Sequence, residues 1–595
     1  MKRSGGPAWK LGLFVAAGCV PFAQNAYYTT FAFTILIAFV LAQSWDWVAG
    51  EMGYVNLGHY CFYGIGAYAF AIALVGKYPA GLSMVFALLA TAVAAALLAL
   101  PLFRLKGDYF AFGTLALLPL AEVLALNLVP ITNGSDGIVL PPENVLTRAY
   151  FIALGVCVAT VVVSTWLTHI RFGYALKSIR NDEEVAEVMG IRIFPVKLAV
   201  IVLAAAFAGL AGGIQAWQLS FIDPGTVFGL NVALVPVAMA LLGGSGLLWG
   251  PLVGVLLLAT MQQWLLVNVK GYQATIYGTV ILLIGRFMPG GLLRAGWVRD
   301  RRWLRGLTQE HHERITGTQD VREASARSMR DLPLARRETD RSRPLLECRE
   351  VTMAFGGNVA VNGVSLKIMQ GEIVGLVGAN GSGKTTLFNC ISKVYEPREG
   401  QILLEGVALG GLRRDQVAHL GVGRTYQIPR PFGDLTVQEN IAVPLMFGAD
   451  RLKPHEALEE AREFVAYAEL EGRLTARADS LSPQEKKSLE FARALACKPK
   501  LLLVDEVASG LTPAEIKRFV GHIRNVRDRY GITVIWVEHI FSALAQVVDR
   551  VVVLEQGLVI ADGTLDEVVR DERVLRTYLG GAAQAAVQPA SAGHA

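Results

Sequence analysis

The amino-acid sequence predicts two different folds in one chain: an all-α membrane half followed by an α/β half. Hydrophobic residues make up 53% of the 595 residues, and their excess lies before residue 293. After residue 345 the chain alternates strand-like and helix-like patterns, which is typical of an α/β domain with a mainly parallel sheet. A chain of this length is also too long for one ordinary core, so at least two domains are expected.

The first half contains apolar runs long enough to cross a bilayer. From a length of roughly 20 residues per span we expect roughly eight to ten membrane helices. The runs lie near residues 11–24, 27–45, 54–76, 81–103, 109–130, 149–170, 198–218, 229–268 and 273–289. The 229–268 run is interrupted by Gly243-Gly244-Ser245-Gly246, which predicts either two segments or a re-entrant pair.

The largest polar loop between these runs, residues 171–197, is rich in Arg and Lys. The positive-inside bias places it in the cytoplasm, together with the basic N-terminus and the basic region after residue 293. We expect an uncleaved first membrane helix rather than a signal peptide. Within the loop, Val185, Val188 and Met189 form one apolar side, which predicts a short amphipathic helix able to dock on a partner domain.

The chain changes character again between the two halves. Residues 294–344 are charged and poor in large apolar side chains, which predicts a linker whose arginines lie near anionic lipid headgroups. These arginines are Arg294, Arg299, Arg301, Arg302 and Arg305. The small polar residues at the C-terminus predict a disordered tail. The expected organisation is a transmembrane domain at 1–293, a linker at 294–344, an α/β domain at 345–580 and a tail at 581–595.

Composition argues against several kinds of site. The net charge of +5 is modest and the basic clusters flank apolar segments. This pattern suits membrane topology, and nucleic acid is not expected as a partner. The six cysteines have neither CxxC pairs nor a metal-ligand spacing, so we expect free, mostly buried thiols.

A glycine-rich motif introduces the chemistry of the second half. Residues 378–385 read Gly-Ala-Asn-Gly-Ser-Gly-Lys-Thr, between a buried strand at 372–377 and a predicted helix. This is a P-loop, in which glycines let backbone N–H groups approach the phosphates of ATP at a helix N-terminus. Lys384 is expected to reach the β- and γ-phosphates, and Thr385 to hold Mg²⁺. The residues assigned to the nucleotide are Gly378, Asn380, Gly381, Ser382, Gly383, Lys384, Thr385 and Thr386.

Two further strands end in ionisable residues. The strand at 500–506 ends in Asp505 and Glu506, and the strand at 532–537 is followed by His539 after Glu538. Ligands of open α/β sheets bind at the carboxyl ends of the strands, so these groups are expected beside the P-loop. Asp505 is expected to hold Mg²⁺ and Glu506 to polarise the attacking water. A histidine after a strand is more often structural, but here we favour a functional one.

In order along the chain, these motifs resemble those of an ABC transporter ATPase over essentially all of residues 346–580. The resemblance implies that Phe355 stacks on adenine. It also implies that Gln427, in Arg-Thr-Tyr-Gln, is the Q-loop glutamine that senses Mg²⁺ and the membrane domain. His539 is then the switch histidine that contacts the γ-phosphate. Gly510-Leu511-Thr512-Pro513 and the ending Arg576-Thr-Tyr-Leu-Gly are similar to the LivG-type ATPase of branched-chain amino acid importers.

Segments of the first half resemble a LivM-type permease of the same importers. They are Gly-Tyr-Val-Asn-Leu-Gly-His at 53–59, Gly-Ile-Gly-Ala-Tyr at 64–68 and Gly-Asp-Tyr-Phe-Ala at 107–111. Glu184 to Gly190 fits the coupling-helix pattern of importer permeases. The chain therefore resembles a permease fused to its ATPase.

The signature motif departs from the family pattern Leu-Ser-x-Gly-Gln. Here it reads Leu481-Ser482-Pro483-Gln484-Glu485. The resemblance implies that this loop acts on the partner's nucleotide in a head-to-tail dimer. A side chain at Gln484 and the charge of Glu485 would then weaken the site to which Ser482 contributes. Our hypothesis is a heterodimer with one intact site, built on Lys384 and Glu506, and one weakened site; a homodimer would weaken both.

Candidate residues for the solute path are Glu122, Asn56 and His59. Glu122 lies inside an apolar run, where an unpaired ionisable group is costly; it is either functional or paired to a neighbouring helix. Gln215 and Gln218 are weaker candidates. The nearby Tyr60 and Tyr63 are expected to pack or anchor rather than bind.

The resemblance implies ATP-driven uptake of branched-chain or other hydrophobic amino acids across the bacterial inner membrane, with the ATPase domain in the cytoplasm. ATP and Mg²⁺ are the implied cofactors. The implied partners are a second permease and a second ATPase subunit, or a second copy of this chain, and an extracytoplasmic solute-binding protein. The alternatives are import of another small organic solute (an amide, urea or an aromatic acid), export, and a membrane-anchored regulatory ATPase.

Overall fold

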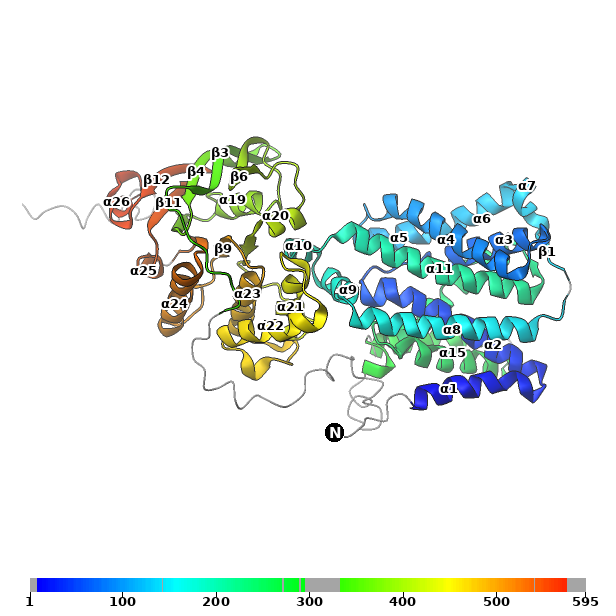
Figure 1. Cartoon of the computed structure of the whole chain (residues 1–595). Coiled ribbons are helices and arrows are strands. Elements are labelled where there is room, and N and C mark those ends of the chain that lie inside the picture. Colours follow the sequence, from blue (N-terminus) through cyan, green and yellow to red (C-terminus); the bar gives the residue numbers. More distant parts are fainter. Residues whose placement is uncertain are drawn as a thin grey trace, which may run out of the picture. The chain divides into compact units, whose positions relative to one another are not determined.

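The computed structural model describes residues 8–141, 143–269, 272–287, 290–294, 332–539 and 541–574. Within them the chain forms two compact units. The first unit holds residues 8–180 and 193–294. The second unit holds Asn181–Arg192 together with residues 332–574. A short segment from the first half of the sequence therefore packs as part of the C-terminal unit (Figure 1).

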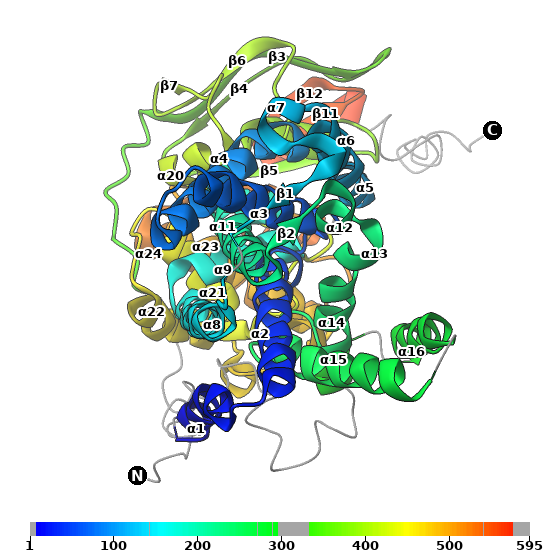
Figure 2. The same cartoon turned by 90° about the vertical axis from the view of Figure 1, so that its right-hand side faces the viewer.

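The first unit is helical, and its long helices, among them α4, α8 and α11, lie alongside one another (Figure 1), with α8 seen nearly end-on in Figure 2. The main helices are α1 (Ala8–Cys19), α2 (Ala26–Asp46), α3 (His59–Val75), α4 (Ala80–Leu102), α5 (Asp108–Leu115), α6 (Leu117–Asn127), α8 (Leu146–His169), α9 (Arg171–Asn181), α11 (Ile193–Leu219), α14 (Val235–Gly243), α15 (Gly250–Asn268) and α16 (Gln273–Phe287). Shorter elements are α7 (Val129–Thr132), β1 (Ile138–Val139), β2 (Phe221–Ile222), α12 (Pro224–Phe228) and α13 (Leu230–Ala233).

The prediction of an all-α membrane half is confirmed. Among the described residues, 6 helices are long and apolar enough to cross a membrane. The expectation of roughly eight to ten spans also counted apolar runs that form shorter helices, such as His59–Val75. The 229–268 run divides as its glycines suggested, because Gly244 and Gly246 have positive φ between α14 and α15.

Small residues bring the helices of this unit close together. A Cβ built on Gly66 of α3 would collide with the backbone of Gly209 of α11. Lipid tails are as apolar as the helices, so close van der Waals packing rather than the hydrophobic effect must hold the two helices together. Glycine at position 66 is therefore required by the packing of α3 on α11.

The second unit contains two sheets. A six-stranded sheet has the order β12-β11-β5-β10-β9-β8, and a four-stranded antiparallel sheet has the order β4-β3-β6-β7. The strands are β3 (Pro344–Phe355), β4 (Asn358–Met369), β5 (Ile373–Gly378), β6 (Glu399–Leu404), β7 (Val407–Ala408), β8 (Val422–Arg424), β9 (Leu501–Asp505), β10 (Thr533–Val537), β11 (Arg550–Glu555) and β12 (Leu558–Gly563). The α/β prediction is confirmed.

Three buried parallel strands bring the predicted motifs to one edge of the larger sheet. Strand β10 pairs in parallel with both β5 and β9, with Val537 opposite Leu376 on one side and Asp505 on the other. Every residue of the three strands is buried, as expected for strands covered on both faces. The P-loop, Glu506 and His539 follow directly from their carboxyl ends.

Helices complete the second unit. They are α10 (Glu183–Val188), α19 (Lys384–Ile391), α20 (Arg414–Leu420), α21 (Val437–Phe447), α22 (Pro454–Tyr467), α23 (Pro483–Ala496), α24 (Pro513–Tyr530), α25 (Phe541–Leu544) and α26 (Leu565–Arg570). Helices α21, α22 and α23 pack on one another (Figure 1). The end of the predicted linker packs on this unit too, since Leu332 is buried and Arg337 donates to the carbonyls of Lys498 and Pro499.

Some sequence-based expectations lie outside the described residues. These concern the linker arginines Arg299, Arg301, Arg302 and Arg305, and the tail 581–595. The cysteine prediction is confirmed, since all six cysteines are free and only Cys19 is exposed.

The helix contact at Gly66 can be tested by overpacking it. Replacing Gly66 with Leu should lower the stability of the membrane unit by about 1–3 kcal/mol, because the added side chain meets backbone atoms that cannot rotate away. The matched control is Gly155→Leu in α8, where a Cβ meets nothing within 4 Å. Thermal denaturation of the detergent-solubilised chain, followed by size-exclusion chromatography, should show a lower midpoint for Gly66→Leu alone. Equal losses in both variants would contradict the packing argument.

Candidate functional site

The P-loop has the backbone shape needed to surround phosphate. It joins β5 to α19, and Gly381 and Gly383 adopt φ of +81° and +103°, a region that L side chains rarely adopt. A Cβ on Gly383 would also collide with the carbonyl of Ala360, and one on Gly378 with Ser382. The exposed Thr385 lies in the first turn of α19, where backbone N–H groups are free of helical partners.

Lys384 is folded against its own loop. Its Nζ donates to the carbonyl oxygens of Gly378, at 2.7 Å, and Ala379, at 2.9 Å. The side chain is buried, and burial lowers its pKa, while the charges of Glu506 and Asp505 act in the opposite direction. The ammonium group is therefore held at the loop.

Asp505 ends β9 as a buried carboxylate with spare coordinating capacity. Its backbone N–H donates to Thr425 Oγ1 at 3.0 Å, and its Oδ1 accepts no hydrogen bond from the described residues. Burial raises its pKa to about 6, although Arg424, with Nη2 3.7 Å from Oδ2, lowers it. Mg²⁺ in nucleotide sites is typically held by one or two carboxylates plus substrate phosphates, so Asp505 fits a Mg²⁺ ligand.

Glu506 lies at the centre of the catalytic group predicted from the sequence. Gln427 Nε2 donates to Glu506 Oε2 at 2.5 Å, and His539 Nε2 lies 2.8 Å from Glu506 Oε1. The backbone of Glu506 has a φ of +45°, and its N–H donates to the carbonyl of Val537 on the neighbouring strand. Non-glycine residues in this conformation are concentrated at functional sites. Three residues far apart in sequence thus meet at one carboxylate.

Phe355 ends β3 with its ring partly exposed. The ring is 43% exposed and makes an edge contact with Tyr395, with the centroids 5.0 Å apart. An exposed ring face of this kind is available for stacking on a planar base.

The altered signature forms an ordered helix start. Ser482 is the N-cap of α23: its Oγ accepts from the N–H of Glu485, and Glu485 Oε2 accepts from the N–H of Ser482 at 2.8 Å. Glu485 is also paired with Arg473 at 3.0 Å. Gln484 Nε2 donates to Glu515 near the start of α24. The two replaced side chains are therefore engaged with their own unit, which the sequence did not indicate.

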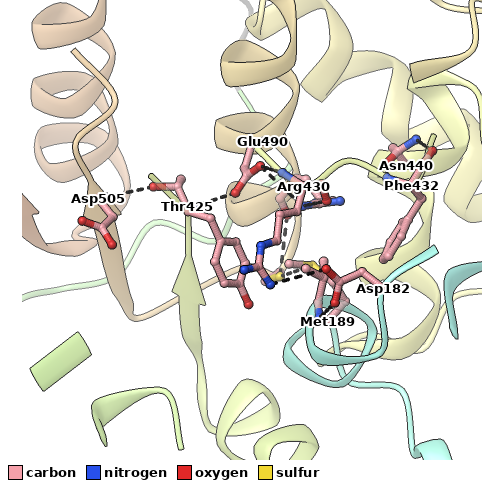
Figure 3. Close-up of polar contacts among 12 residues, drawn as sticks. Asp182, Met189, Thr425, Arg430, Phe432, Asn440, Glu490 and Asp505 are labelled. Atoms are coloured by element: carbon pink, nitrogen blue, oxygen red, sulfur yellow. Dashed lines mark hydrogen bonds and ion pairs between the residues drawn. The ribbon is translucent and has the colours of Figure 1, made fainter. Parts of the chain in front are cut away.

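The segment 181–192 forms the predicted amphipathic helix within the second unit. Val185, Val188 and Met189 are buried, and Met189 Sδ lies 3.5 Å from Cys497 Sγ. Glu184 lies 3.4 Å from Arg430, and a Cβ on Gly190 would be 2.9 Å from the carbonyl carbon of Phe447 (Figure 3 shows the neighbouring contacts).

Further ion pairs hold the same segment. Asp182 caps α10 and lies 3.5 Å from Arg430, and Glu187 lies 3.2 Å from Arg414. Burial raises the pKa of Glu187, and Arg414 opposes that shift. Acidic side chains of the segment thus meet basic ones of the C-terminal part of the chain.

The first unit contains a partly open cavity whose lining includes Gln215, one of the weaker candidates for the solute path. The cavity has a volume of about 630 Å³ and is lined by α2, α3, α11, α12, α13, α14 and α15. Its polar lining includes Tyr60, Tyr63, Gln215, Gln262 and Gln263, and no described lining residue is charged.

The three residues predicted for the solute path do not line this cavity. His59 Nε2 lies 2.9 Å from Ser44 Oγ, and Asn56 Oδ1 accepts from the N–H of Gly58. Both residues are buried, and Glu122 is half-buried in α6. A role for Asn56, His59 and Glu122 in transport stays a prediction.

Comparisons with known proteins match both halves of the chain. "Branched-chain amino acid transport system / permease component" matches residues 27–285, "ABC transporter" residues 361–509, and "Branched-chain amino acid ATP-binding cassette transporter" residues 559–584. The high-affinity branched-chain amino acid transport ATP-binding protein BraF of Pseudomonas aeruginosa is 36% identical over 252 residues, which cover 40% of this chain and 99% of BraF. The chain belongs to the branched-chain amino acid ABC transporter family.

Other relatives match the same part of the chain. LivG, a high-affinity branched-chain amino acid transport ATP-binding protein of Salmonella typhimurium, is 37% identical over 252 residues, covering 40% of this chain and 99% of LivG. A solved structure of a nucleotide-free ATP-binding cassette from an ABC transporter is 26% identical, with a TM-score of 0.37, and covers 40% of this chain and 100% of that one.

Family membership settles the general activity. The chain is a multi-pass membrane protein that joins a permease and an ATPase. Its ATPase domain binds ATP, and hydrolysis is coupled to transport. Members of the family normally work as dimers with other subunits, and import systems use a binding protein.

Sequence reasoning missed four charged residues around this transporter's nucleotide site. They are Arg424, Arg430, Glu490 and Arg493. Glu490 and Arg493 are fully buried in α23, where Glu490 accepts from the N–H groups of Tyr426 and Arg430. Burial raises the pKa of Glu490, and Arg493 and these two N–H groups oppose the shift. Two charged residues inside an otherwise apolar stretch, Leu489 to Ala496, were the available signal.

The raised pKa of Asp505 predicts a pH dependence of stability. Between its usual pKa of 3.8 and about 6, the folded chain binds a proton at Asp505 that the unfolded chain releases. Stability should therefore fall as pH rises through this window, by at most about 3 kcal/mol. Thermal unfolding without nucleotide should show the wild type losing stability relative to Asp505→Asn between pH 4 and pH 7.

The control for this measurement is Asp479→Asn, because Asp479 is exposed. The difference in melting temperature between wild type and this control should stay constant across the same pH range. A constant difference for Asp505→Asn as well would contradict the assigned burial effect.

Proposed function

We propose that this chain takes up branched-chain or other hydrophobic amino acids as the fused permease–ATPase subunit of a binding-protein-dependent importer. The observation that carries this proposal is the match of a permease family over residues 27–285 and an ATP-binding family of the same transport system within one polypeptide. The relatives BraF and LivG are named for high-affinity branched-chain amino acid transport.

In the proposed nucleotide site, different residues at the sheet edge bind the phosphates, the base and Mg²⁺. The P-loop from Gly378 to Thr386 binds the phosphates through its N–H groups and Lys384, while Phe355 stacks on the base. Thr385, Asp505 and Gln427 would hold Mg²⁺, which when bound neutralises charge on the phosphate oxygens.

Glu506 orients the attacking water and accepts its proton. Its carboxylate is already held from both sides by Gln427 and His539, so its rotation costs those two contacts. We also assign to His539 the contact with the γ-phosphate. These three residues form the catalytic group of the proposed mechanism.

The segment 181–192 is the proposed coupling helix. It lies in sequence between α9 and the membrane helix α11, yet it packs within the ATPase unit. Glu184 is paired with Arg430, three residues after Gln427. The close packing at Gly190 leaves no space for a side chain there. Movement of the membrane helices therefore has a short route to the catalytic group.

The uncharged cavity supports a small solute with an apolar part and no net charge. A fully charged group there would lack a counter-charge among the described lining residues, which is costly within a membrane. Apolar side chains such as Ile37, Leu41 and Met239 line it beside glutamine amides and tyrosine hydroxyls. Its volume of about 630 Å³ lies in the range usual for small-molecule sites.

The same lining also favours the second candidate, an uncharged solute such as an amide or urea. Both candidates require a separate solute-binding protein and place the chain in the bacterial inner membrane with the ATPase in the cytoplasm. A second permease and a second ATPase subunit, or a second copy of this chain, complete the transporter.

The altered signature supports an asymmetric pair of sites. Ser482 is retained and the loop is ordered, but Gln484 stands where the family has glycine. Because Arg473 offsets the charge of Glu485, the proposed weakening rests on Gln484 alone. Robust ATP hydrolysis by the full chain alone, as a homodimer, would overturn the hypothesis of a weakened site.

Reconstituted vesicles test the proposed function. The full chain, its partner subunits and the binding protein should take up labelled leucine only when ATP is present on the ATPase side. Lys384→Ala should lower uptake by at least about a hundredfold, since the phosphate charge then lacks its ammonium partner. Competition by unlabelled amide or urea instead of valine would favour the second candidate, and ATP-driven efflux would overturn import.

The cavity itself is tested by removing one amide. Gln215→Leu should raise the KM for leucine uptake by about tenfold, because a solute group loses a hydrogen-bond partner. The matched control is Asn127→Leu, which removes an exposed amide of α6 outside the cavity lining. An unchanged KM in Gln215→Leu would contradict a role for this cavity in uptake.

A further inference from the structure

Glu490 closes the loop that carries Gln427. Its Oε1 accepts from the N–H of Tyr426 at 2.6 Å and its Oε2 accepts from the N–H of Arg430 at 2.7 Å. The two N–H groups lie on either side of Gln427, so one carboxylate holds both ends of the five-residue segment 426–430. Figure 3 shows Glu490 directed at the loop that carries Thr425 and Arg430.

Arg493, one turn further along α23, also binds the 426–430 loop. Its Nη2 donates to the carbonyl of Arg430 at 2.9 Å and lies 3.7 Å from Glu490 Oε2. Glu490 is 2% exposed and Arg493 is 0% exposed. Both backbone polar groups of Arg430 are therefore bound to α23, through side chains that are themselves buried.

The side chain of Arg430 points to another part of the unit. Its Nη1 lies 3.5 Å from Asp182 and 3.4 Å from Glu184, both in the segment 181–192 (Figure 3 labels Asp182). The residue following α23, Cys497, contacts Met189 of the same segment. Helix α23 and the 426–430 loop thus meet the segment 181–192 at two separate points.

The two ends of this assembly carry groups of two different proposed sites. Gln427 contacts Glu506 of this chain's own site. Ser482 caps α23 and belongs to the signature loop, which the proposed function assigns to the partner's site. A rigid link between loop and helix would move both groups together.

We propose that Glu490 is a positioning residue that makes the 426–430 loop and α23 move as one body, so that a displacement of the segment 181–192 reaches Gln427 and Ser482 at the same time. This inference rests on the proposed function. Hydrogen bonds to a carboxylate are shorter and stronger than neutral ones, which suits a link that must transmit movement. Glutamine in its place has one acceptor oxygen for two N–H donors, so one end of the loop is released.

A merely structural role predicts something different. If Glu490 only satisfied buried N–H groups, its replacement would lower stability and affect the functions of Gln427 and Ser482 independently. The free-energy effects of two substitutions add when the two residues act independently, and they do not add when the residues are coupled. Double-mutant cycles on ATP hydrolysis therefore separate the two roles.

The test uses the full chain assembled with its partner subunits, with Mg-ATP as the probe. Glu490→Gln should lower kcat for ATP hydrolysis about tenfold, with a change of less than about twofold in KM for ATP. Gln427→Ala and Ser482→Ala should each lower kcat in the wild-type background. Each should have less than about a twofold further effect in the Glu490→Gln background. Additive losses in both cycles would overturn the proposal.

Glu459→Gln is the matched control, since Glu459 is exposed on α22; it should change neither parameter and leave both cycles additive. Hydrogen–deuterium exchange of the wild-type assembly guards against a variant that does not fold. Peptides covering residues 426–430 and the start of α23 should exchange together, and both should slow together on addition of ATP without Mg²⁺. Independent exchange of the two regions would overturn the proposed role of Glu490, whichever solute is transported. If the two regions exchange together but leucine is not taken up, only the proposed function is overturned.

Discussion

The parallel register of β5, β10 and β9 is the constraint on which the nucleotide site depends. The residues of these strands are buried, and β10 pairs with both neighbours over most of its length. A slip by one residue would move every side chain of a strand to the opposite face. Because the register is fixed by buried apolar residues, the loops that follow the strands start from fixed points. The contacts of Glu506 with Gln427 and His539 are a consequence of that alignment.

The same core contains an unusual amount of buried charge. Asp505 is paired with Arg424, and Glu490 with Arg493, and all four side chains are nearly inaccessible to solvent. Buried ion pairs are weak evidence for stability, because the desolvation penalty can exceed the attraction between the charges. Their value here lies in geometry: each pair holds a loop or an acid in one arrangement.

The segment 181–192 binds the second unit through two kinds of contact. Its apolar side chains, Val185, Val188 and Met189, are buried in the second unit, while acids such as Glu184 and Glu187 meet arginines of the same unit. Burial provides affinity, and the ion pairs favour one orientation of the helix. Its covalent ends continue into α9 and the membrane helix α11, so in a fused chain this segment also has a fixed local concentration at its docking surface.

The sequence by itself determined the two fold classes, because both rest on local patterns: long apolar runs for the membrane helices, and short buried strands that end in Gly378, Asp505 and Val537. It also determined which residue types serve the nucleotide, since the P-loop and the acids follow strands at readable positions.

Only the tertiary structure decided how these residues are supported. Glu490 and Arg493 lie within an apolar stretch of α23. The neighbouring sequence does not indicate that they bind the loop of Gln427, which lies some sixty residues earlier in the chain. The same holds for Glu485, which reads as a free negative charge but is paired with Arg473, and for the proposed solute cavity, whose lining comes from seven helices. Hydrophobic periodicity reports which side of one element is buried. The partner of a buried charge depends on contacts between elements, and those are set by the packing of the whole unit.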